Sequence, residues 1–153
     1  MTALAAPIGE SIATVKIQLF GGIAIGRVGT PQLTKDGVAE VASLDDLMAT
    51  MLKVIMQRIT AKDYQDVATL IRNGCDLALG LASARQMYGL AFQPSECLKA
   101  LLYFQSSDLA ELSQADRETL IKAVKKVREL AVLRLRSKQL SGLGVARDQN
   151  LDL

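Results

Sequence analysis

The chain has 153 residues, of which half are apolar, and its formal net charge is +2. A chain of this length fits one domain, and folding would bury roughly two-thirds of the surface that the unfolded chain exposes. No apolar run approaches the roughly 18 residues of a membrane-spanning helix. The first ten residues lack the basic start and apolar core of a secretory signal, so we expect a cytoplasmic protein without a membrane segment.

Histidine is absent, and the only two cysteines, Cys75 and Cys97, lack Cys-x-x-Cys spacing. This composition excludes a zinc site built from cysteine and histidine, and it excludes nucleophiles that a histidine activates. Hydrolase mechanisms therefore lose their commonest base near neutral pH. We expect both thiols to be small hydrophobic residues of the core.

Positive charge is concentrated near the C-terminal end of the sequence. Residues 117–147 contain nine basic and two acidic side chains, whereas residues 1–116 contain nine basic and twelve acidic ones. Several Lys and Arg on one helix face could bind a phosphate backbone or another acidic partner. Against this, Val132, Leu133 and Leu135 interrupt the charges, and no aromatic side chain lies among them for base stacking.

The N-terminal part has the pattern of strands. Residues 12–19 alternate between apolar and polar side chains, Gly21 and Gly22 suit a tight turn, and residues 23–28 suit the returning strand of a hairpin. Residues 38–42 could add a further strand. Because a two-stranded unit is marginal by itself in water, we expect it to pack on helices or on other strands.

Helix start and stop signals follow from residue 43 onward. Ser43 with Asp46, Thr60 with Asp63, and Ser113 with Asp116 have the spacing of a capping hydroxyl and an acid at the third helical position. The first of these helices has an apolar stripe of Leu44, Leu47, Met48, Met51, Ile55 and Ile59. The other expected boundaries are Gly74 at the end of the second helix, Asp76 and Gly89 around a third, Pro94 at the start of a fourth, and Leu130 near the end of the fifth.

The predicted fold class is therefore α+β, a small antiparallel hairpin or partial sheet followed by a bundle of four or five helices. We expect residues 1–140 to form a single domain. Periodicity is lost and the Gly, Ser, Asn and Asp content rises after about residue 139, so residues 141–153 are predicted to be a flexible tail.

One segment resembles a known family. Residues 47–53 read LMATMLK, Arg58 follows, and residues 62–71 read KDYQDVATLI. This pattern is similar to the C-terminal, helical part of nucleotidyltransferase-fold proteins of the AbiEii type, which include toxins of bacterial toxin–antitoxin systems. Residues 92–101, FQPSECLKAL, are similar to other members of the group. The resemblance implies a nucleotidyltransferase-like C-terminal domain.

The resemblance also implies candidate site residues. Asp63 matches the acid of the family's last motif and would be catalytic, and Arg58 and Lys62 could contact a nucleotide phosphate. The competing interpretation is structural, because Asp63 also suits a helix N-terminus, and the two basic residues could be solvated or paired with acids. Asp66, three residues after Asp63 on the same helical face, leaves the same alternatives open.

Two departures bear on catalysis. The family's N-terminal half has a Gly-Ser turn followed by magnesium-binding acids, and this chain has no Gly-Ser dipeptide. Met51 also replaces a lysine of the family, and a thioether cannot contact a phosphate as an ammonium does. Since nucleotidyl transfer needs a divalent cation, the chain is expected to be inactive by itself, with no cofactor and with magnesium only if a catalytic half is supplied. A divergent enzyme would need ligands from Asp36, Glu40, Asp45, Asp46 and Asp63.

The expected activity is therefore association. The partner would be a catalytic half, an antitoxin-like protein or a second copy of the chain. The alternative is a module that binds nucleic acid or an acidic partner through its basic C-terminal helix.

Overall fold

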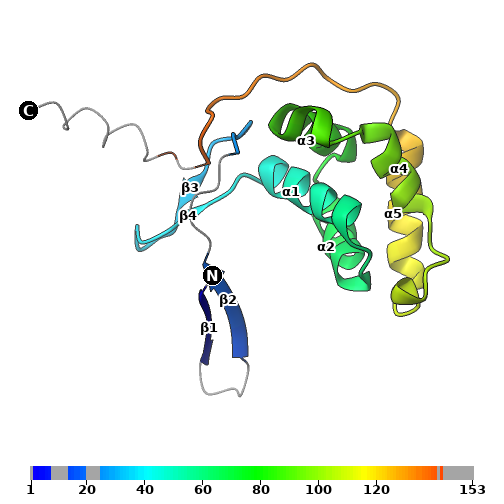
Figure 1. Ribbon diagram of the computed structural model, residues 1–153, viewed down its shortest axis with the longest axis horizontal. Coiled ribbons are helices and arrows are strands. Elements are labelled where there is room, and N and C mark those ends of the chain that lie inside the picture. Colours follow the sequence, from blue (N-terminus) through cyan, green and yellow to red (C-terminus); the bar gives the residue numbers. More distant parts are fainter. Residues whose placement is uncertain (1, 8–13, 20–24, 141, 143–153) are drawn as a thin grey trace, which may run out of the picture.

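The computed structural model describes residues 2–7, 14–19, 25–140 and 142. In these ranges, two short antiparallel hairpins precede five α-helices, so the fold is α+β (Figure 1). The first hairpin pairs β1 (Thr2–Pro7) with β2 (Thr14–Leu19), and the second pairs β3 (Gln32–Leu33) with β4 (Glu40–Val41). Within the described ranges, no helix has the length and apolar character needed to cross a membrane.

The helices begin where the sequence predicts. They are α1 (Leu44–Gln57), α2 (Ala61–Arg72), α3 (Leu77–Tyr88), α4 (Pro94–Leu102) and α5 (Gln114–Lys126), with single turns of 3-10 helix at Gly89–Ala91 and Ser107–Leu109. The side chains of Ser43, Thr60 and Ser113 each accept a hydrogen bond from the N–H of the third helical residue. Gly74 after α2 and Gly89 after α3 have φ angles of 92° and 56°, which L-residues rarely adopt.

The hairpins differ from the prediction in their pairing. The alternating stretch does form β2, but its partner is β1, with Leu4 opposite Ile17, and not residues 23–28. Residues 25–28 are not a strand; Arg27 instead makes an isolated bridge to Ser137. The predicted turn at Gly21 lies outside the described residues. The further strand expected at 38–42 is confirmed as β4, which pairs with β3.

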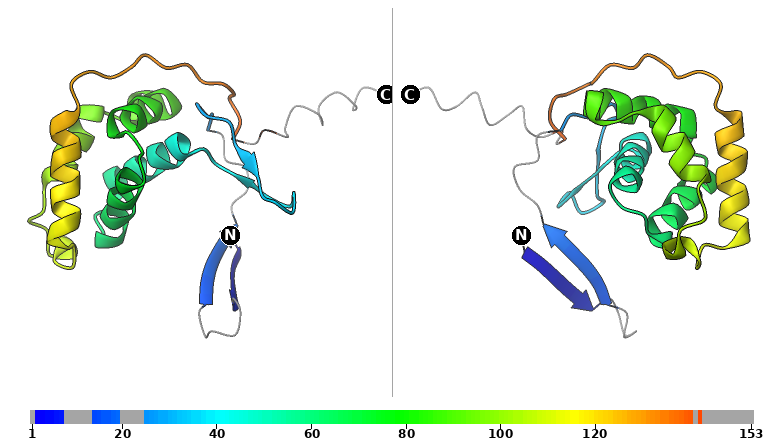
Figure 2. Two further views of the ribbon diagram at one scale, coloured as in Figure 1. Left: turned by 180° about the vertical axis from the view of Figure 1, so that it is seen from behind. Right: turned by 45° about the vertical axis from the view of Figure 1, so that its right-hand side comes forward.

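The core lies between the helices, with α1 packed against α2, α3 and α4 and with α5 packed against α2 and α4 (Figures 1 and 2). The predicted stripe on α1 is partly wrong, because Leu44, Leu47 and Ile59 are exposed. The buried face of α1 is formed by Met48, Ala49, Leu52 and Ile55. Gly80 of α3 lets α3 approach α1 closely, since a Cβ there would collide with the side chain of Met48.

The fifth helix is shorter than predicted. It ends at Lys126. Residues 127–140, hereafter the strap, run in extended form past α3 and back to the N-terminal segment that contains Arg27 (Figure 1). Arg85 of α3 donates a hydrogen bond to the carbonyl of Ala131 (3.1 Å), and the N–H of Arg27 donates to the carbonyl of Ser137 (3.0 Å). Leu130 therefore lies in the strap and not in a helix, and it is partly buried against the core. Of the predicted tail, only Gly142 lies within the described residues.

Candidate functional site

Asp63 and Arg58 come together at the junction of α1 and α2. The Asp63 carboxylate accepts hydrogen bonds from the Thr60 hydroxyl (2.6 Å) and from Nε and Nη2 of Arg58 (2.9 and 3.2 Å). Asp63 is only 3% exposed, whereas the Arg58 side chain is 65% exposed. Burial raises the pKa of Asp63, but the hydrogen bonds from Arg58 and Thr60 and the charges of Arg58 and Lys62 outweigh it, so the pKa lies below its ordinary value. The Asp63 carboxylate is thus held in place by its hydrogen bonds from Thr60 and Arg58.

Lys62 does not join this group. Its ammonium pairs with Asp66 one helical turn later (3.2 Å), on the solvent-exposed side of α2. Such exposed pairs at i, i+4 spacing contribute about 0.3–0.5 kcal/mol to a helix. The structure therefore separates the three candidate residues into one capping network, Asp63 with Arg58, and one surface ion pair.

The geometry at Asp63 recurs at two other helices. Asp46 and Asp116 stand at the same position of α1 and α5, accept hydrogen bonds from Ser43 and Ser113 (2.7 and 2.8 Å), and are 3% and 8% exposed. Asp46 also accepts from two main-chain N–H groups of the N-terminal segment, at residues 28 and 29 (2.7 and 2.9 Å). These acids hold the hydroxyls that cap the helices and at the same time hold other segments in place.

The hydrogen bonds of Asp116 connect two helices that are distant in the sequence. Its carboxylate accepts a hydrogen bond from Arg72 Nη1 (2.6 Å), which joins the start of α5 to the end of α2. The hydrogen bonds from Arg72 and Ser113 lower its pKa. Asp116 and Glu118 also form the chain's Asp-x-Glu triplet, but no Gly-Ser turn precedes it, and Asp116 is committed to this cap.

The acids named for a divergent enzyme do not converge. Asp36 bonds Thr34 and the N–H of Val38 within the β3–β4 loop. Asp46 and Asp63 lie near opposite ends of α1, a 14-residue helix about 20 Å long. Across residues 2–7, 14–19, 25–140 and 142, no group of three His, Cys, Asp or Glu side chains could hold a metal ion.

Burial raises the pKa of both cysteine thiols. Cys97 is fully buried, and burial raises its pKa to about 12, so it is a core residue as predicted. Cys75 is half-buried, and burial together with the nearby charge of Asp45 raises its pKa.

A surface groove of about 500 Å³ lies beside Arg58, between the α1–α2 junction and α4. Most of its lining is apolar, with Ile59 and Tyr103 at its exposed parts. The Tyr64 hydroxyl donates to the carbonyl of Ala100 (2.9 Å), and burial raises the pKa of Tyr64 to about 12, so its phenol remains protonated. Arg58, Lys99 and Glu96 are the charged residues of the groove.

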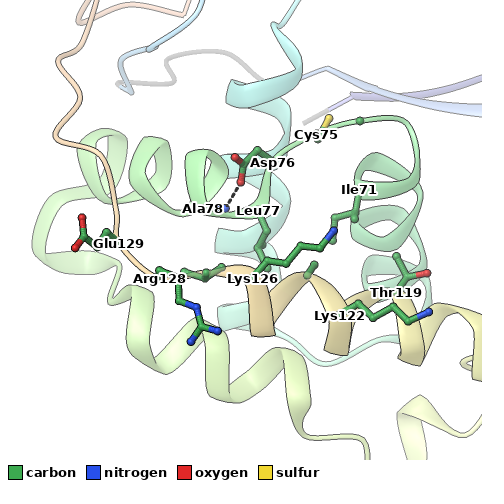
Figure 3. Close-up of a pocket in the computed structure, with 13 residues that line it drawn as sticks. Ile71, Cys75, Asp76, Leu77, Ala78, Thr119, Lys122, Lys126, Arg128 and Glu129 are labelled. Carbon is green, nitrogen blue, oxygen red and sulfur yellow. Dashed lines mark hydrogen bonds between the residues drawn. The ribbon is translucent and has the colours of Figure 1, made fainter.

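A second pocket, the basic pocket, has a volume of about 610 Å³ and lies between the α2–α3 turn and the C-terminal half of α5 (Figure 3). The sequence does not predict this pocket, although the concentration of basic residues at 117–147 indicates a candidate binding surface on its helix. The spacing of Lys122 and Lys126 is the sequence signal that could have placed both on one face of α5. Its lining residues are Ile71, Gly74, Cys75, Asp76, Leu77, Ala78, Thr119, Lys122, Ala123, Lys126, Val127, Arg128 and Glu129.

The nine basic residues of the C-terminal part are not all on one helix. Arg117, Lys122, Lys125 and Lys126 belong to α5, and the rest follow it, because the helix ends at Lys126. Comparison of the chain with protein-family models, with curated proteins and with solved structures finds no match.

Proposed function

We propose that this chain is a nucleotidyltransferase-like protein that is not catalytic by itself and acts by association, with a second copy of the chain or with another protein. The observation that supports this proposal best is the use of its buried acids. The carboxylates of Asp46, Asp63 and Asp116 each accept a hydrogen bond from the hydroxyl that caps their helix and further hydrogen bonds from other segments, so all three are already held by donors of the chain itself.

The first hairpin supports association. In both ribbon figures β1 and β2 extend away from the helices, and among the described elements neither strand packs substantially on a helix (Figures 1 and 2). An isolated two-stranded hairpin is marginal in water, and its strand edges can pair with another chain. A partner that covers or extends this hairpin would supply the missing stabilisation.

Light scattering of the full chain, with a protomer mass of 16.5 kDa, tests this proposal. Substituting Ile17→Lys places a charge at an apolar position of β2, and Gln18→Lys is the matched control, because it adds the same charge at the neighbouring polar position. We expect the wild type and Gln18→Lys to be larger than a monomer and Ile17→Lys to be monomeric. A monomeric wild type would contradict self-association, and equal masses for all three oligomers would contradict the role of the hairpin.

A second candidate function is binding to nucleic acid or to an acidic protein. Lys122, Lys125 and Lys126 are exposed on α5, and no ion-pair partner of theirs lies in the described part of the chain. Binding through phosphate contacts would weaken steeply with salt. Fluorescence anisotropy with labelled duplex and single-stranded DNA at low salt tests it, and the absence of binding there would reject this candidate.

A further inference from the structure

We propose that the basic pocket binds a small phosphate ester whose remaining part is apolar. The pocket volume of about 610 Å³ lies within the usual range of small-molecule sites, roughly 300–1,000 Å³. This inference does not rest on the proposed association, because the hairpin contributes nothing to the pocket.

The charge of the pocket comes from Lys122, Lys126 and Arg128. Lys122 and Lys126 are one helical turn apart on α5, and in Figure 3 the Lys126 side chain reaches toward Ile71 while the Lys122 side chain reaches toward Thr119. All three basic residues are exposed, and no acid pairs with them among the residues that the structure describes. Lysine ammonium groups are common ligands of phosphate.

Two acids also line the pocket, but they do not cancel this charge. The carboxylate of Asp76 accepts a hydrogen bond from the N–H of Ala78 (2.8 Å) and so caps α3 (Figure 3). Glu129 points away from the two lysines in the same view. Three basic side chains against two acids leave the lining of the pocket with a net charge of +1.

The apolar part of the ligand would lie on the floor of the pocket. Ile71, Leu77, Ala123 and Val127 line it, and Leu77 and Ala123 are buried. A purely inorganic anion would leave this apolar surface in contact with water. A phosphate ester with an aromatic or aliphatic body would bury it, and such burial contributes about 25 cal/mol per Å².

Naphthyl phosphate, naphthol and inorganic phosphate test the two parts of this assignment separately. Binding to the full chain would be followed by the intrinsic fluorescence of the naphthyl group and by calorimetry for phosphate. We expect naphthyl phosphate to bind at least about tenfold more tightly than either naphthol or phosphate, because only it uses both the lysines and the apolar floor. Equal affinity for naphthol would overturn the phosphate assignment, and equal affinity for phosphate would overturn the role of the floor.

A matched pair of variants locates the site. Lys122→Gln/Lys126→Gln removes the two pocket lysines, whereas Lys125→Gln removes a charge from the same helix outside the pocket. All three positions are exposed, so circular dichroism should report unchanged folding. We expect the double variant to weaken naphthyl phosphate binding about tenfold or more and Lys125→Gln to change it less than about twofold. No binding to the wild type at low salt, or equal weakening by Lys125→Gln, would overturn the proposal.

Discussion

Removing the Asp63 carboxylate should destabilise the fold, whatever its effect on chemistry. In the Asp63→Ala variant, the N–H of residue 63 can still donate to the Thr60 hydroxyl and so keep the cap, but the carboxylate in the first turn of α2 and its hydrogen bonds from Thr60 and Arg58 are lost. Loss of a favourable charge at a helix N-terminus costs about 0.3–1 kcal/mol. Removal of a buried, charge-assisted acceptor adds about 2 kcal/mol, so the free energy of unfolding should fall by about 2–3 kcal/mol.

For a chain of this size, each kcal/mol shifts Tm by about 2–4 °C, so Asp63→Ala should melt about 4–12 °C below the wild type. Thermal unfolding followed by circular dichroism measures the shift. Thr60→Ala removes the hydroxyl of the cap and leaves the carboxylate, so the free energy of unfolding should fall by about 1 kcal/mol. Asp66→Ala should change Tm little, because its ion pair with Lys62 is exposed. An Asp63→Ala Tm equal to that of the wild type would refute the structural role given to this carboxylate.

Three further predictions concern packing and pH. Gly80→Ala should lower the free energy of unfolding by about 1–3 kcal/mol in urea titrations, because its methyl group would collide with Met48. Gly26→Val should detach the strap, because a Cβ at position 26 would collide with the main-chain carbonyl of Ser137. Limited proteolysis should then cleave within residues 127–140 faster than in the wild type. The folded-state pKa values of Asp63 and Asp116 lie below the ordinary value of about 3.9, so both stabilise the fold above about pH 4 and lose that effect as the pH falls further. Asp63→Asn/Asp116→Asn should therefore flatten the acid limb of urea midpoints measured from pH 2.5 to 6.

Local signals in the sequence predicted most of the helices. Ser43, Thr60, Asp76 and Ser113 act within one turn of the chain, so the residues that decide each helix start are adjacent in sequence. Leu44 is exposed, although the sequence predicts that it is buried. The predicted apolar stripe has the helical period but lies on a slightly different face of α1, because packing against α3 and α4 determines which face is buried.

Long-range contacts were not predictable in the same way. Residues 25–28 look like a returning strand, yet Arg27 is held by Ser137, more than a hundred residues later. The sequence predicts that Asp116 belongs to a capping box, but no neighbouring residue indicates that Arg72 is its partner. The Arg58–Asp63 contact was anticipated as one alternative because only five positions separate the two residues.

The basic pocket illustrates the same limit for function. The charge of α5 was evident from composition, but the pocket also needs the α2–α3 turn to lie opposite Lys122 and Lys126. That placement depends on the packing of α2 against α5, which only the folded chain specifies.

The central claim, that the chain does not catalyse nucleotidyl transfer by itself, is tested most directly by incubating the purified protein with labelled nucleoside triphosphates, magnesium, and RNA or protein acceptors. We predict no incorporation above a control without protein for the wild type, Thr60→Ala and Asp63→Asn alike. Magnesium-dependent incorporation by the wild type and by Thr60→Ala that is lost in a folded Asp63→Asn variant would contradict the claim and make Asp63 a catalytic residue.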